Sequence, residues 1–325
     1  MIAPGNNSGA FFCLVSRLIN KYLEELIYIQ TMESYNFSRI AAGVWKWGEW
    51  GHRLSTAQIQ ELIEVSIGVG ITSFDHADIY GHYTDEAAFG VVLARQPSLR
   101  QQMQLVTKCG IQLVTPNRPS HKVHSYNTSR EHIVQSAETS LRNLHTDVLD
   151  LLLIHRPDPL MDPDEIAEAF DALRQQGKVK HFGVSNFTPS QFTLLQSRTP
   201  LVTNQVEASL LRREPFLDGT FDQCITHRIQ PMVWSPLGSG RIFTAPDDPQ
   251  VLRIHAAAQP LCEQYQVSLD QLLLAWLLKH PSRLIPVLGT AQPARIQAAA
   301  AALSITLTRE EWFTLWVAAA GEDIP

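Results

Sequence analysis

The feature that most constrains the fold is a regular alternation of short apolar runs with segments of helical period. From residue 39 onward, apolar residues recur every three or four positions in the segments between the runs. Runs that are apolar almost throughout are typical of strands in a parallel sheet with both faces covered. The sequence therefore predicts eight strands, over residues 39–45, 72–77, 104–109, 149–155, 179–185, 203–206, 231–235 and 284–289.

Helix start and stop signals lie between these runs. Gly70 and Gly177 stand where a helix must end and the chain turn into a strand. A buried stripe is expected on one helix, from Ile133, Ala137, Leu141 and Leu144. Helix starts are predicted from the capping-box pairs Ser55/Gln58, Thr128/Glu131, Thr188/Gln191 and Thr308/Glu311, and from Asp162 before Pro163.

Eight βα units favour an α/β fold of one domain, a closed (β/α)8 TIM barrel over residues 32–325. An extra helix is expected over residues 308–319. The alternative, a doubly wound open sheet, needs a glycine-rich turn directly after the first strand. Gly68 and Gly70 instead follow a predicted helix, and we interpret them as marking its end. Residues 1–31 are interpreted as a disordered or short-helical extension or, because Met32 precedes the first strand, as an upstream misassigned start.

Composition excludes several classes of function. The formal net charge is −6, which does not predict binding to nucleic acid or to an anionic membrane. The apolar runs are far shorter than the roughly 20 residues that span a bilayer. The cysteines at positions 13, 109, 224 and 262 form no cluster, so we expect reduced thiols, no metal and a cytoplasmic location. Nothing apolar demands a partner subunit, and a monomer or a weak homo-oligomer is expected.

Four ionisable residues fall at the carboxyl ends of predicted strands, where a barrel places its active site. They are Asp75, Tyr80, Lys108 and His155. A nearby ammonium lowers the pKa of a tyrosine, and a carboxylate such as Asp75 balances a buried lysine. The histidine can orient a carbonyl oxygen. Each residue alone has an ordinary structural role, but together they suit a general acid that faces a polarised C=O.

The sequence here resembles the aldo-keto reductase superfamily. Residues 70–81 (GITSFDHADIYG), 106–108 (VTK) and 153–155 (LIH) match its motifs for the catalytic Asp, Tyr, Lys and His. Residues 75–81 and 154–161 (IHRPDPLM) are most similar to a bacterial group of YdhF-like oxidoreductases. The resemblance covers nearly everything after residue 38. It implies a (β/α)8 barrel, NADPH, and reversible reduction of aldehydes or ketones, with Tyr80 as the proton donor.

Later strand ends carry groups that suit a nicotinamide cofactor. Asn186 and Gln205 offer amides for the carboxamide, and Trp234 offers a ring for stacking. The resemblance implies that Arg295 binds the 2′-phosphate, but few charges accompany it, so use of NADH stays open. The full set of expected cofactor contacts is Gly43, Trp45, Ser185, Asn186, Gln205, Trp234, Ser235, Leu237, Gly238, Gly240, Arg241, Gly289, Thr290, Gln292 and Arg295.

Three tryptophans in the first loop, Trp45, Trp47 and Trp50, are expected beside the barrel mouth as a substrate pocket. Trp47 and Trp50 either form a pocket wall or cover the barrel. Two other functions remain open: an aldolase that uses Lys108 as a Schiff-base lysine, and a nucleotide-sensing regulatory module of the same fold. The aldolase would leave Tyr80 and Arg295 without a role. The sequence does not identify the substrate beyond a small carbonyl compound.

Overall fold

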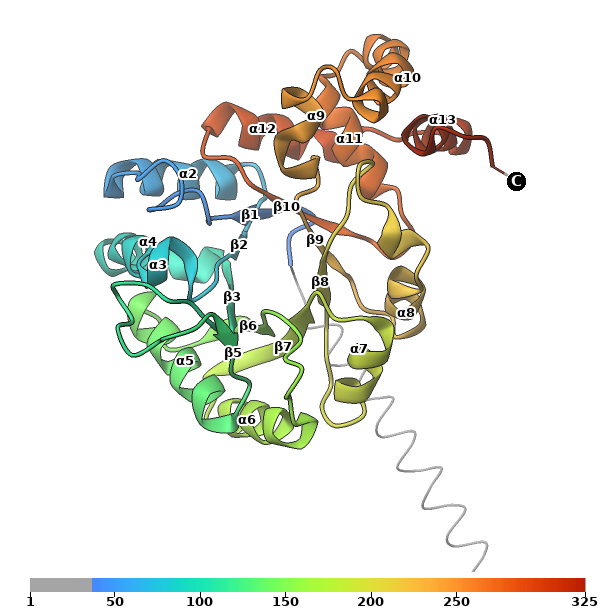
Figure 1. The fold of residues 1–325 in the computed structure, drawn as a ribbon. Helices are drawn as coiled ribbons and strands as arrows, with labels where there is room; N and C mark the ends of the chain where they lie inside the picture. The colour runs from blue at the N-terminus through green and yellow to red at the C-terminus, as the bar shows by residue number, and fades with distance from the viewer. Residues whose placement is uncertain (1–36, 325) are drawn as a thin grey trace, which may run out of the picture. The chain divides into compact units, whose positions relative to one another are not determined.

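The computed structural model describes residues 37–324, which form a closed barrel of eight parallel strands (Figure 1). Hydrogen bonding runs in the order β1-β10-β9-β8-β7-β6-β3-β2 and closes through the pairing of β1 with β10. The predicted extension over residues 1–31 lies outside the described residues. The strands are β1 (Ala41–Gly43), β2 (Ser73–Asp75), β3 (Gln104–Cys109), β6 (Leu149–Ile154), β7 (Val179–Ser185), β8 (Asn204–Glu207), β9 (Met232–Trp234) and β10 (Ile285–Leu288).

All eight predicted strands are confirmed, and the helices surround them (Figure 1). A small antiparallel hairpin of β4 (Ile111–Gln112) and β5 (Ser125–Tyr126) was not expected. The α-helices are α2 (Thr56–Gly68), α3 (Tyr80–Tyr83), α4 (Asp85–Arg95), α5 (Arg130–Asn143), α6 (Pro163–Gln175), α7 (Pro189–Gln196), α8 (Thr220–Thr226), α9 (Arg241–Thr244), α10 (Pro249–Tyr265), α11 (Leu269–Leu278), α12 (Pro293–Ala301) and α13 (Arg309–Ala320). Short 3-10 helices are η1 (Pro97–Gln102), η2 (Glu214–Phe216), η3 (Gly238–Gly240) and η4 (Ala302–Ser304).

Most of the expected helix caps form. The capping boxes of α2, α7 and α13 are present, and Asp162 caps α6 through the backbone N–H of Asp164. The start of α5 was placed one residue too early. Its N-cap is Ser129, whereas the hydroxyl of Thr128 donates to the carboxylate of Asp158 at 3.1 Å. Because Thr128 has this tertiary partner, the adjacent serine takes the capping role.

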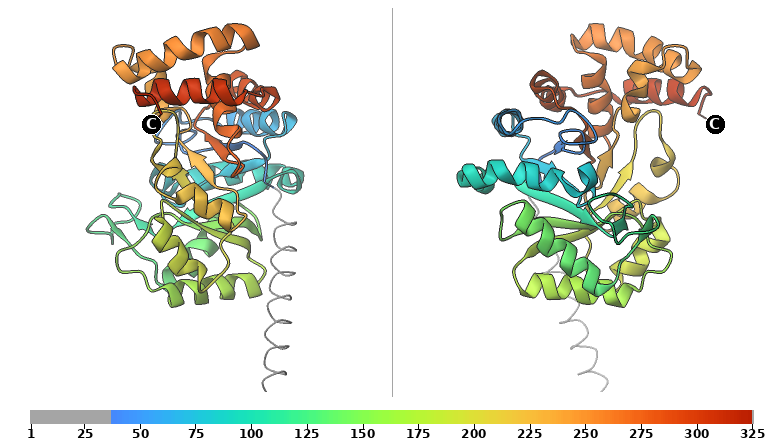
Figure 2. Two further views of the ribbon diagram at one scale, coloured as in Figure 1. Left: turned by 90° about the vertical axis from the view of Figure 1, so that its right-hand side faces the viewer. Right: turned by 60° about the vertical axis from the view of Figure 1, so that its left-hand side comes forward.

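The core has two parts, one of which lies under the C-terminal helices. Two helices that the barrel does not require, α10 and α13, pack side by side on its outside (Figure 2). Trp276 on α11 is fully buried and stacks on Trp312 of α13, with ring centroids 4.8 Å apart. Each of these indoles donates to the other residue's backbone carbonyl, at 3.1 and 3.0 Å. The extra C-terminal helix is thereby fixed to the barrel.

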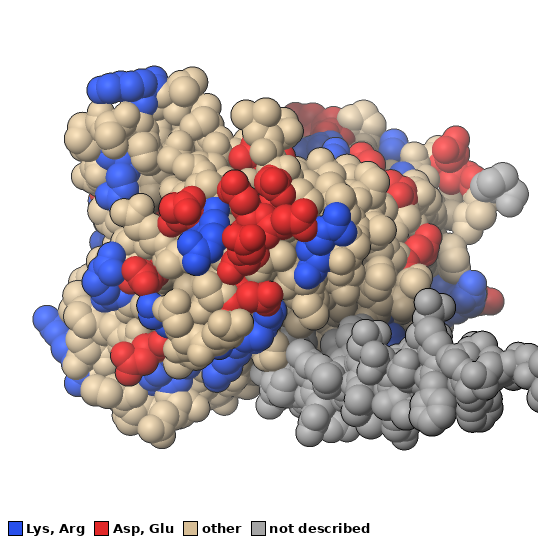
Figure 3. All heavy atoms as spheres, turned by 90° about the horizontal axis from the view of Figure 1, so that it is seen from below, with Lys and Arg blue, Asp and Glu red and all other residues tan. Residues whose placement is uncertain are grey.

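The surface carries charges of both signs. In Figure 3, which views the bottom face of Figure 1, basic side chains surround a group of acidic ones. No continuous basic area appears among the described residues of this face. Within residues 37–324, no helix is long and apolar enough to cross a membrane.

Candidate active site

The four predicted catalytic residues lie together at one end of the barrel. Asp75 ends β2, Tyr80 begins α3, Lys108 lies in β3, and His155 directly follows β6. The Lys108 ammonium donates to Asp75 Oδ2 and to the His76 carbonyl, both at 2.8 Å, and to the Tyr80 hydroxyl at 3.3 Å. The Tyr80 and His155 rings meet edge to face, 6.0 Å apart. One lysine thus connects a buried carboxylate to a phenol.

Burial controls the protonation of Tyr80. Desolvation raises the pKa of Tyr80 above its ordinary value, and the nearby Lys108 ammonium lowers it by a smaller amount. The lowered pKa that we expected from the sequence is wrong, because burial outweighs the effect of Lys108. A raised pKa keeps the phenol protonated at neutral pH, which suits a residue that donates a proton.

Lys108 is charged and His155 is neutral, although both are buried in the same site. Burial by itself lowers the pKa of Lys108, but Asp75 and Tyr80 more than reverse this, so the pKa is raised and the ammonium persists. Burial, and then the charges of Lys108 and Arg156, lower the pKa of His155 well below its usual value. His155 is therefore neutral, with one ring N–H to donate. A permanently charged Lys108 is a poor Schiff-base nucleophile, which disfavours the aldolase alternative.

The first loop and the loop that carries Tyr80 each require glycine at one position. A Cβ atom added to Gly48 or to Gly81 would lie 1.8 Å from Asp85 Oδ1, and Gly81 also has a φ of +57°. Asp85 accepts a hydrogen bond from the backbone N–H of Glu49 at 3.3 Å, joining the first loop to α4. Close packing around this carboxyl therefore holds the loop of Tyr80 against the first loop.

Hydrogen bonds to residues of other strands already engage the predicted carboxamide-binding residues. Gln205 Nε2 donates to Asp75 Oδ1 at 2.9 Å, and the Trp234 indole donates to Asn186 Oδ1 at 2.9 Å. Asn186 Nδ2 donates to the Ser185 hydroxyl at 2.8 Å and, at 3.4 Å, to the carbonyl of His155. These bonds fix the side chains around the mouth. The roles expected of Asn186, Gln205 and Trp234 toward a cofactor stay predictions.

The loop after β9 is a tight turn in which several residues have positive φ values. Ser235, Gly238, Ser239 and Gly240 all have positive φ values, and the backbone N–H groups of Gly238 and Gly240 donate to the carbonyls of Ser235 and Leu237, at 2.8 and 3.1 Å. A Cβ atom on Gly240 would have no neighbour within 4 Å, so this part of the backbone is open. Leu237, which opens the turn, is half-buried against both parts of the core. Arg241 is less free than expected, because its guanidinium forms an ion pair with Asp248 at 2.7 Å.

The loop after β10 leaves one arginine unpaired. Arg295 is exposed, and its side chain contacts no charged or hydrogen-bonding group among the described residues. Gly289 and Gln292 are also exposed, while the hydroxyl of Thr290 accepts from the Gln292 backbone at 3.1 Å. Gly43 has a structural use as well: a Cβ atom there would lie 2.6 Å from the Leu288 carbonyl oxygen on β10.

The three tryptophans of the first loop have different environments. Trp47 is only 2% exposed and packs between Phe74 and Phe89, so it covers the barrel and is not part of a substrate pocket. Trp50 meets the Tyr80 ring edge to face at 6.0 Å. Trp45 is 40% exposed beside Gly289. Trp45 and Trp50 remain candidates for contact with ligands, and Trp47 does not.

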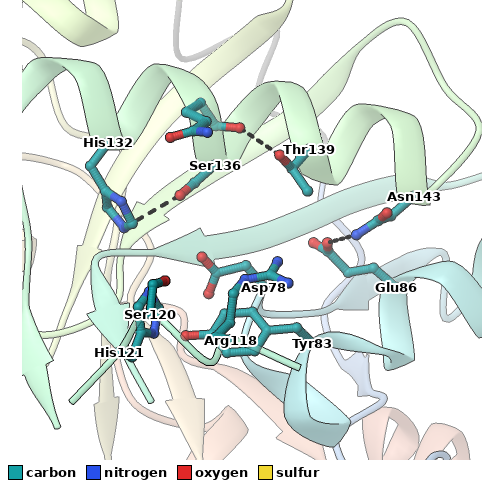
Figure 4. Close-up of a pocket in the computed structure, with 11 residues that line it drawn as sticks. Asp78, Tyr83, Glu86, Arg118, Ser120, His121, His132, Ser136, Thr139 and Asn143 are labelled. Atoms are coloured by element: carbon teal, nitrogen blue, oxygen red, sulfur yellow. Dashed lines mark hydrogen bonds between the residues drawn. The ribbon is translucent and has the colours of Figure 1, made fainter. Parts of the chain in front are cut away.

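A separate polar pocket of about 290 Å³ lies between the segment around Arg118 and one face of α5 (Figure 4). It contains Asp78, whose pKa is raised well above its usual value by burial and by the nearby Glu86 carboxyl. It contains none of the four predicted catalytic residues. Across residues 37–324, no group of three or more His, Cys, Asp or Glu side chains is arranged to hold a metal ion.

Sequence reasoning missed two charged residues at the barrel mouth. Arg156 directly follows His155, and its guanidinium carbon lies 5.7 Å from the centroid of the Trp234 ring. Glu207 is the last residue of β8 and pairs in register with Trp234. The position of Arg156 beside His155 was a usable signal. Glu207 gave none, because the strand was expected to end at Val206.

Comparison with known proteins agrees with this geometry. The model of the Aldo/keto reductase family matches residues 39–316. Oxidoreductase YdhF of Escherichia coli is 49% identical over 89% of this chain and 96% of that protein. A 6-dehydroglucose reductase of Agrobacterium fabrum is 44% identical over 91% and 99%. The structure of an aldo/keto reductase from Klebsiella pneumoniae in complex with NADP and acetate superposes with a TM-score of 0.70, at 27% identity over 86% of this chain and 90% of that one. The chain therefore belongs to the aldo/keto reductase family of oxidoreductases.

Proposed function

We propose that this protein is an NADPH-dependent carbonyl reductase in which Tyr80 is the general acid. The observation that carries the proposal is the set of hydrogen bonds from the Lys108 ammonium to Asp75 and to the Tyr80 hydroxyl, at 2.8 and 3.3 Å. A regulatory module that only senses nucleotide would not need a buried, charge-balanced lysine against a phenol. The name of the Agrobacterium relative makes a sugar-derived aldehyde a reasonable substrate to test.

The side chains divide the chemistry between them. His155, neutral and next to Tyr80, donates a hydrogen bond that orients the carbonyl oxygen. Tyr80 donates its proton to that oxygen as a hydride reaches the carbonyl carbon. Lys108 stabilises the phenolate that remains, and Asp75 keeps Lys108 charged. Reversal of the same steps oxidises an alcohol.

The proposed cofactor is NADPH, which supplies the hydride when it is bound. The open backbone at Gly240 and the neighbouring Arg241 guanidinium are suited to hold its pyrophosphate. Arg295 is suited to the 2′-phosphate, because its guanidinium is exposed and unpaired among the described residues. A single arginine at that position discriminates weakly, so use of NADH as well is compatible with the proposal.

The test is a Tyr80→Phe variant assayed for NADPH consumption over a panel of aldehydes and sugars. Loss of the phenol removes the proton donor, and general acid catalysis is typically worth about 10²–10⁴-fold in rate. We expect kcat to fall by at least about 10²-fold. The Kd for NADPH, measured by fluorescence, should stay within about twofold of the wild-type value. Turnover close to wild type would refute the assignment of Tyr80. NADPH binding without turnover of any carbonyl by the wild type would favour the regulatory module.

A further inference from the structure

Arg156 has hydrogen-bonding capacity that the protein does not use. A guanidinium carries five N–H donors, and none of those on Arg156 meets an acceptor among residues 37–324. The side chain is half-buried beside His155 and lies over the Trp234 ring. It is close enough to the reacting groups to lower the pKa of both His155 and Tyr80. An acceptor supplied by a bound molecule would complete this environment.

Glu207 is a second charge beside Trp234, with which it pairs in register. Side chains alternate along a strand, so Glu207 points the same way as Gln205, which contacts Asp75 inside the barrel. Glu207 is half-buried, and burial raises its pKa. It forms no ion pair with Arg156, and no described residue donates a hydrogen bond to its carboxylate. A group that needs hydrogen-bond acceptors and a group that needs donors therefore lie beside the same tryptophan.

This arrangement selects among carbonyl compounds. A carboxylate near the reacting carbon would be attracted by Arg156 but repelled by Glu207. A hydroxyl group is both acceptor and donor, so a substrate with several hydroxyls satisfies both residues at once. We propose that Arg156 and Glu207 are specificity-determining residues that bind hydroxyl groups on carbons next to the reacting carbonyl. The inference rests on the proposed carbonyl reductase function and extends it to polyhydroxylated substrates.

The experiment compares two aldehydes of equal chain length, glyceraldehyde and propanal, which differ by two hydroxyl groups. The measured quantity is the ratio of their kcat/KM values in the wild type and in the Arg156→Met and Glu207→Gln variants. A site built to bind a hydroxyl loses discrimination when its partner is removed. We expect the ratio to fall about 10- to 100-fold in Arg156→Met, as for hydrogen bonds to charged groups, and less in Glu207→Gln.

Matched controls separate this role from a structural one. Arg95→Met removes an exposed arginine at the end of α4 and should leave the ratio unchanged. Arg156→Lys keeps the charge without the planar fork and should give an intermediate ratio. Melting temperature and the Kd for NADPH show whether each variant is folded.

The outcomes distinguish the inference from the proposed function. Turnover with the same ratio in Arg156→Met as in wild type refutes the inference and leaves the proposed function standing. A wild-type preference for succinic semialdehyde over glyceraldehyde, lost in Arg156→Met and increased in Glu207→Gln, also refutes it, because Arg156 would then read a carboxylate. No turnover of any aldehyde by the wild type refutes the proposed function, and the inference with it.

Discussion

Replacing Lys108 with methionine tests whether an unpaired, buried Asp75 carboxylate lowers the free energy of unfolding of the protein. Lys108 is 1% exposed and Asp75 is 3% exposed, and their charged atoms are 2.8 Å apart. Methionine fills nearly the same space without the charge. The variant therefore leaves the Asp75 carboxylate buried, with only the hydrogen bond from Gln205.

The magnitude follows from the geometry. At 2.8 Å and an effective dielectric constant of about 20, the attraction between two unit charges is about 6 kcal/mol. Desolvation offsets much of this, and removing one partner of a buried pair typically costs about 3–5 kcal/mol. The double variant Asp75→Asn with Lys108→Met leaves no unpaired charge. Its free energy of unfolding should therefore fall only by the cost of the hydrogen bonds that it loses. The His76 carbonyl loses its donor in both variants, so that cost cancels between them.

Urea unfolding followed by circular dichroism measures the effect. We expect Lys108→Met to have a free energy of unfolding about 3 kcal/mol or more below that of the double variant, at equal m-values. Both should lack carbonyl reduction, so activity does not distinguish them. Equal stability of the single and double variants, within about 0.5 kcal/mol, would show that the Asp75 charge is not the source of the cost.

Three further predictions concern the cofactor loop, pH and the C-terminal helix. Arg295→Ala should weaken NADPH binding about 10-fold or more with little effect on NADH, as measured by Kd for each; equal effects would mean that Arg295 does not read the 2′-phosphate. Burial raises the pKa of Asp85 from 3.8 to about 6, so the stability due to its protonation is present below pH 4 and is lost as the pH rises through 6. Asp85→Asn should therefore narrow the difference in stability between pH 5 and pH 8, and a variant with the wild-type pH dependence would contradict this. Trp276→Ala should cost about 3–5 kcal/mol by urea unfolding, because it opens a cavity against Trp312; a loss below about 1 kcal/mol would show that the stack adds little.

The barrel could be predicted from the sequence because each strand is covered by helices on one side and by the packed barrel interior on the other. Burial on both sides makes the strands apolar, and the sequence shows this. The boundaries of β3 and β7 were predicted to the residue. The β4-β5 hairpin was missed because its strands are two residues long and half exposed. Motif spacing brought Asp75, Tyr80 and Lys108 together correctly.

The environment of each side chain was harder to predict than its position. Whether Trp47 faced a pocket or the core depended on Phe74 and Phe89, which reach it from other elements. The net pKa direction of Tyr80 depended on burial, which no local pattern reveals. Glu207 was outside the predicted strand, so its place at the mouth became visible only with the closed barrel.

The pairing of β1 with β10 has a consequence for synthesis of the chain. Ala41 is in register with Val287. The first and last strands of the barrel, which are nearly the whole domain apart in the sequence, therefore pair with each other. At typical translation rates of about 5–20 residues per second, β1 waits on the order of 10 to 50 s for its partner. During that interval β1 and the strand completed most recently are unprotected edges, the kind of strand that pairs with other chains. The four residues of β10, Ile285–Leu288, end that exposure, and we expect truncations before them to aggregate.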